Sequence, residues 1–158
     1  LADLPGYLCD EIGVEPAEKS PRTGDGDNLP TFAEMERELI ARALTQDAKI
    51  MVLDEPTAHL DFCHELMVLE IITWLVKEKG ITIIMATHFL NQAFYLENAG
   101  VRTRVALMNH GKFEAIGSPT EVLTQNNLKN VFKIVSSIGT TDEEGINQKF
   151  IVPLKNIH

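Results

Sequence analysis

Short apolar runs and longer stretches of helical periodicity alternate along the chain from residue 49 onward. The unalternating runs Lys49–Leu53 and Ile81–Ala86 predict two strands that are buried on both faces, as in a parallel sheet. Between them a helix is predicted over Phe62–Lys79, which Gly80 ends. The apolar positions of this helix recur at helical spacing: Leu66, Leu69, Ile72 and Val76. A strand–helix–strand order predicts an α/β protein with parallel strands at its centre.

The pattern also predicts elements on either side of this unit. Residues 1–30 hold four of the seven prolines and four of the ten glycines, which is typical of a loop-rich connector. Thr31 and Glu34 fit a capping box that begins a helix over Thr31–Thr45. The later elements are a helix Leu90–Asn98, a hairpin of Arg104–Met108 and Lys112–Ile116, short helices Ser118–Leu123 and Leu128–Phe132, and a last hairpin that turns at Asp142–Gly145 before the strand Phe150–Leu154.

Length, charge and cysteine content narrow the class of protein. A chain of 158 residues has a one-domain length. Its net charge of −9 argues against a dedicated nucleic-acid binder, because such proteins carry basic clusters. No apolar run approaches the roughly 20 residues that a membrane-spanning helix needs. Two cysteines, Cys9 and Cys63, favour a reducing compartment, and Cys63 is expected to be packed on its helix.

Two adjacent carboxylates, Asp54 and Glu55, stand where the first predicted strand ends. Ligands of open α/β sheets bind outside the carboxyl ends of the strands. One carboxylate could anchor Mg²⁺, a cation that prefers oxygen ligands, and the other could orient or deprotonate a water for attack on phosphate. A solvated acidic strand end is the plain alternative, and the following Pro56, Thr57 and Asp61 argue against it.

His88 follows the second predicted strand in the same way. An imidazole at this place could contact a γ-phosphate. The remaining histidines are expected to be surface residues without a zinc-site spacing, and His59 is a candidate contact to a neighbouring subunit. No G-x-x-x-x-G-K-[ST] phosphate loop occurs in the sequence. The chain therefore has the metal and water side of a nucleotide site without the phosphate cradle.

Together these segments resemble the ATP-binding cassette (ABC) ATPases. The resemblance rests on Leu39–Leu44, Ile50–Thr57, Ala58–Asp61 and Thr87–His88, and it covers the chain from about Pro30 onward. It implies that Asp54 is the Walker B aspartate and Glu55 the catalytic glutamate. Asp61 then lies in the D-loop, and His88 is the switch histidine.

The resemblance also implies a fold and a setting. The fold is an α/β, P-loop NTPase-like parallel sheet with a C-terminal extension of β-hairpin and helix. Residues 1–30 would come from the helical subdomain region, and residues 31–158 would form the C-terminal part of a longer ATPase domain. The cofactors would be ATP and Mg²⁺. The partners would be a second ATPase subunit and membrane-spanning permease subunits, with no nucleic acid, at the cytoplasmic face of the cell membrane.

The C-terminal segments, among them Met108–Lys112, Gly117–Pro119 and Phe150–Leu154, are similar to ATPases that import iron-siderophores, haem and cobalamin. We therefore expect a subunit that drives uptake of an iron chelate or a related metal complex. This chain alone is expected to be inactive, because it lacks the phosphate loop. Two alternatives stay open: a soluble ABC-type ATPase of DNA maintenance, and a degenerate regulatory module that does not hydrolyse ATP.

The signature motif departs from the family. Counted back from Leu39, its place is held by Pro30-Thr31-Phe32-Ala33-Glu34. The resemblance assigns Thr31, Ala33 and Glu34, with Asp61, to nucleotide contacts. Phe32 stands where glycine would let the backbone approach phosphate. Slow or asymmetric ATP hydrolysis by the intact protein is the expected consequence, unless a partner subunit supplies a normal signature.

Overall fold

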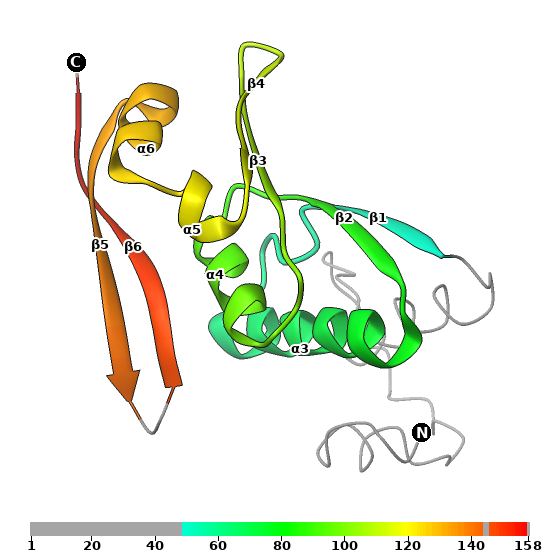
Figure 1. Cartoon of the computed structure of the whole chain (residues 1–158). Coiled ribbons are helices and arrows are strands. Elements are labelled where there is room, and N and C mark those ends of the chain that lie inside the picture. Colours follow the sequence, from blue (N-terminus) through cyan, green and yellow to red (C-terminus); the bar gives the residue numbers. More distant parts are fainter. Residues whose placement is uncertain (1–48, 144–145, 158) are drawn as a thin grey trace, which may run out of the picture. The chain divides into compact units, whose positions relative to one another are not determined.

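A computed structural model describes residues 49–143 and 146–157 (Figure 1). They belong to one compact unit, Lys49–His158. The predicted helix Thr31–Thr45, the domain boundary at residue 30 and the candidate residues Thr31, Ala33 and Glu34 lie outside the described residues.

Two parallel strands and the helix that joins them form the part of the fold that carries the candidate site. Strand β1 (Ile50–Asp54) pairs in parallel with β2 (Thr82–Ala86), and the last pair of the register is Asp54 with Ala86. Helix α3 (Phe62–Lys79) connects them. Both strands thus end at the same edge, as the sequence predicts for a parallel α/β unit.

Helix α3 has the predicted bounds because each end has a strong local signal. The Asp61 side chain accepts a hydrogen bond from the backbone N–H of His64 and caps the first turn. At the other end Gly80 adopts a left-handed conformation with φ of 65°, which costs glycine little. Leu69 and Ile72 are buried as predicted, whereas Leu66 is 44% exposed.

The two strands are not buried on both faces within the described part of the chain, so this expectation was wrong there. Exposure alternates along each strand: Val52 is 72% exposed and Ile84 56%, while Met51 and Ile83 are half-buried. The described elements thus cover only one face of the β1–β2 pair.

The C-terminal half adds two hairpins and three helices. Their bounds are α4 (Asn91–Asn98), β3 (Val105–Asn109), β4 (Lys112–Gly117), α5 (Pro119–Val122), α6 (Gln125–Phe132), β5 (Ile134–Glu143) and β6 (Ile146–Asn156). Strands β3 and β4 turn through His110 and Gly111, both at positive φ, as a two-residue hairpin loop requires. Helix α6 begins three residues earlier than predicted, because Thr124 caps it by accepting a hydrogen bond from the Asn127 N–H.

These elements share one hydrophobic cluster, which we call the C-terminal cluster. Its buried members are Phe94, Leu107, Val122, Leu123, Leu128 and Ile151. Asn91 also joins α4 to β6 directly, since its side chain accepts from the Ile151 N–H at 2.8 Å and donates to the Ile151 carbonyl at 3.3 Å. No helix of the described segments is long and apolar enough to cross a membrane.

Candidate functional site

The backbone brings Glu55 to the edge where β1 and β2 end. Its N–H donates to the Ala86 carbonyl at 2.9 Å, one step beyond the last pair of the strands. Glu55 has a φ of 47°, a left-handed conformation that is unfavourable for a residue with a Cβ. Asp54 is exposed, whereas Glu55 is half-buried. The two carboxylates therefore meet different environments.

Glu55 and His88 form a side-chain pair across this edge. Glu55 Oε1 and His88 Nδ1 are 2.8 Å apart, although the residues are separated by 33 positions in the sequence. The side chains are 36% and 66% exposed, so the pair is open to solvent. The second carboxylate oxygen, Oε2, is buried and has no hydrogen-bond partner. When Nδ1 carries the hydrogen that Glu55 accepts, Nε2 is left for another ligand.

The Phe89 ring lies beside the His88 imidazole. Their ring centroids are 4.1 Å apart and the planes are inclined by 35°. Phe89 also donates its backbone N–H to the Thr87 hydroxyl at 3.1 Å. These contacts limit the freedom of the segment that presents His88.

Behind this pair lies a buried polar network that sequence reasoning missed. Gln92 of α4, only 2% exposed, donates from Nε2 to Thr57 Oγ1 at 2.7 Å and to Glu65 Oε1 at 2.8 Å. Its Oε1 accepts from Thr87 Oγ1 at 3.2 Å. One signal in the sequence could have pointed to Gln92. Residues four positions apart lie on the same face of a helix, and Gln92 precedes Leu96 by four, so a polar side chain lies on the face of α4 that is buried.

Asp61 is engaged by its own helix. Its Oδ1 accepts from the His64 backbone N–H at 2.9 Å and lies 2.7 Å from His64 Nδ1. The hydrogen bond from the His64 backbone is the largest cause that lowers the pKa of the Asp61 carboxyl below its usual value. Asp61 is exposed and remains a candidate for a contact to nucleotide. His59, also exposed, has a φ of 68°.

Cys63 is exposed, so the expectation that it is packed was wrong. It occupies the second position of α3, before the buried face of the helix begins at Val68. A helix residue this close to the N-terminus has no preceding turn of α3 to pack beside.

At the strand edge the exposed Asp54 carboxylate is the oxygen ligand that could take part in holding a Mg²⁺ ion. Across the described segments there is no group of three or more His, Cys, Asp or Glu residues that could form a metal cage. Asp54 is exposed at the strand end, and Mg²⁺ is commonly held by one or two carboxylates together with substrate phosphates and waters. Asp54 would hold such an ion, and the ion would offset phosphate charge.

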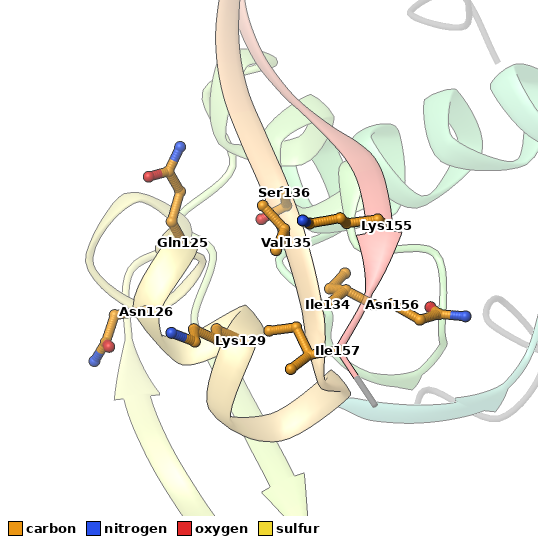
Figure 2. Close-up of a pocket in the computed structure, with 9 residues that line it drawn as sticks. All are labelled: Gln125, Asn126, Lys129, Ile134, Val135, Ser136, Lys155, Asn156 and Ile157. Carbon is orange, nitrogen blue, oxygen red and sulfur yellow. The ribbon is translucent and has the colours of Figure 1, made fainter.

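An open cleft of about 660 Å³ lies elsewhere, between α6 and the β5–β6 hairpin. Its lining includes Lys129, Ser136 and Lys155 but none of the candidate residues. Figure 2 shows its lining residues, which come from α6, the start of β5 and the end of β6.

Comparison with known proteins finds relatives of this chain. No protein-family model matches the chain. The petrobactin import ATP-binding protein of Bacillus anthracis is 36% identical over 120 residues, which are 76% of this chain and 41% of that protein. The chain is homologous to the ATP-binding subunits of ABC importers. The ferric enterobactin transport ATP-binding protein of Escherichia coli is 33% identical over 119 residues, which are 75% of this chain and 41% of that protein.

A solved structure is also similar to this chain. This structure, described as an inward-facing conformation of a putative metal-chelate type ABC transporter, matches this chain with a TM-score of 0.66 and 28% identity. The match covers 76% of this chain and 46% of that one. The α/β fold expected from the sequence is thereby confirmed. The chain spans about two fifths of the length of the curated relatives it matches.

Proposed function

We propose that this chain supplies the water-activating half of an ATP-hydrolysing site in an ABC importer that takes up an iron chelate. The observation that carries the proposal is the 2.8 Å pair of Glu55 and His88 at the common edge of two parallel strands. The import of an iron chelate is supported by relatives named for petrobactin, iron(3+)-hydroxamate and ferric enterobactin.

Each residue has a proposed role. The Glu55 carboxylate orients the attacking water and receives its proton, because a positioned carboxylate acts as a general base. His88 Nε2 contacts the γ-phosphate while Nδ1 stays on Glu55, so the imidazole links the phosphate to the base. Asp54 holds Mg²⁺, which ATP carries.

The nucleotide contacts across the subunit interface would come from Asp61 and from Thr31, Ala33 and Glu34. A second ATPase subunit and permease subunits complete the assembly at the cytoplasmic face of the membrane. Because the sequence holds no G-x-x-x-x-G-K-[ST] loop, this chain by itself does not hydrolyse ATP.

The test is ATP hydrolysis by the complete subunit with its permease. Glu55→Gln preserves the shape and an oxygen for His88 but removes the base, so ATP binding should persist while hydrolysis is lost. Glu78→Gln, an exposed change in the last turn of α3, is the matched control and should retain the wild-type rate. An unchanged rate for Glu55→Gln would overturn the proposal.

A non-hydrolysing regulatory module is the second candidate, because Phe32 and Pro30 alter the signature segment. It predicts that the wild-type complex binds ATP without releasing phosphate. A DNA-maintenance ATPase predicts instead a rate that DNA stimulates and no association with a permease.

A further inference from the structure

We infer that Gln92 is a positioning residue that holds the Glu55 segment and the His88 segment at their working separation. The inference rests on the proposed function, since it concerns the geometry of the same site. Gln92 touches neither the base nor the phosphate. It acts through Thr57, two positions after Glu55, and through Thr87, which directly precedes His88.

Beyond the ends of β1 and β2, few interactions join these two segments. The backbone ladder stops at the bond from the Glu55 N–H to the Ala86 carbonyl. Past this point, the side-chain pair of Glu55 and His88 is exposed to solvent and therefore weak. Gln92 supplies a buried connection, with Thr57 on one side and Thr87 on the other.

The chemistry of the network fixes the orientation of the Gln92 amide. A carboxylate can only accept, so the group that faces Glu65 must be the amide NH₂. Nε2 then uses both hydrogens, one on Glu65 and one on Thr57, and Oε1 receives the Thr87 hydroxyl. The Thr87 hydroxyl in turn accepts the Phe89 N–H. Each donor in this network therefore faces an acceptor. Together the hydrogen bonds fix the distance between the segment that carries Thr57 and the segment that carries Thr87.

Gln92→Glu tests this arrangement because it keeps the shape and removes both donors. The new carboxylate would face Glu65, and repulsion would push the segments apart. Displacement of this kind should lower kcat by about tenfold or more, because misplacement by a full ångström can cost about a hundredfold, while the KM for ATP changes little.

The companion variant Gln92→Glu with Glu65→Gln exchanges the two partners. The amide on α3 now donates to the carboxylate on α4. The Thr57 hydroxyl, which accepts in the wild type, rotates to donate, and the Thr87 hydroxyl donates as before. This exchanged protein should recover most of the lost kcat. It also keeps the inference testable if Gln92→Glu alone does not fold.

Asn91→Ala is the matched control. It removes two hydrogen bonds from the neighbouring position of α4, but those bonds go to Ile151 of β6 and not to the site. It should lower the melting temperature of the protein and leave kcat unchanged.

The outcomes separate this inference from the proposed function. The inference is overturned if Gln92→Glu has wild-type kcat, if the exchanged protein folds but stays inactive, or if Asn91→Ala loses kcat in proportion to its stability. The proposed function itself is overturned only when Glu55→Gln keeps the wild-type rate. Loss of hydrolysis in Glu55→Gln with full activity in Gln92→Glu would therefore reject Gln92 alone.

Discussion

Replacing Glu55 by glycine should make the protein more stable while abolishing hydrolysis. Glu55 sits at a φ of 47°, where a residue with a Cβ costs about 1–2 kcal/mol and glycine costs almost nothing. Its buried Oε2 has no partner, and an unsatisfied buried acceptor costs about 1–3 kcal/mol. Both costs disappear in Glu55→Gly.

Two losses oppose this gain. The pair with His88 is exposed, so it contributes at most about 1 kcal/mol. Glycine also adds entropy to the unfolded chain, worth roughly 0.5–1 kcal/mol. The net expectation is a free energy of unfolding higher by about 2 kcal/mol, which in a chain of 158 residues raises the melting temperature by about 4–8 °C.

Thermal and urea unfolding followed by circular dichroism measure this difference. Glu55→Gln is the reference, because it lacks the carboxylate but keeps the side chain at the same φ. Glu55→Gly should melt above both the wild type and Glu55→Gln. A melting temperature equal to or below that of Glu55→Gln would refute the claim that the backbone of Glu55 is strained.

Three further changes test other contacts. His88→Ala should stop hydrolysis, leave nucleotide affinity nearly unchanged in equilibrium binding, and cost less than about 1 kcal/mol in unfolding, because its pair is exposed. Gly139→Ala should lower the melting temperature, since its Cβ would lie 2.5 Å from Phe150 Cζ, and Phe150→Leu in the same chain should restore part of the loss. The lowered pKa of Asp61 means that its stabilising effect is present above the usual value of 3.8 and is lost as the pH falls through the lower folded-state value. Melting temperatures of wild type and Asp61→Asn should therefore differ at neutral pH and converge in acid.

The sequence predicts the fold best where local chemistry determines the structure. Both ends of α3 have a strong capping signal, Asp61 and Gly80, and the observed bounds of this helix match the prediction. The predicted strand of the last hairpin, Phe150–Leu154, was too short. The observed strand β6 runs Ile146–Asn156, and its partner β5 runs Ile134–Glu143. Polar residues in these strands, such as Ser136 and Thr140, interrupt the apolar pattern although they pair along the ladder.

The candidate site was predictable in part. Parallel strands end at one edge, so the approach of Glu55 to His88 follows from their positions after β1 and β2. The role of Gln92 does not follow from local sequence, because its partners come from three different segments. Only the packing of α4 against α3 brings them within hydrogen-bond distance.

Helix α4 has neighbouring residues that contact two different parts of the compact unit. Gln92 is hydrogen-bonded into the strand edge, while Asn91 holds β6 and Phe94 fills the C-terminal cluster. In hydrogen-exchange terms, we expect the strand edge and the C-terminal cluster to open as separate units that share α4. Amide protons of the β5–β6 hairpin should therefore exchange without opening the β1–β2 ladder, whereas release of α4 should deprotect both units together. The slowest exchange in α4 then reports the stability of whichever unit is the more stable.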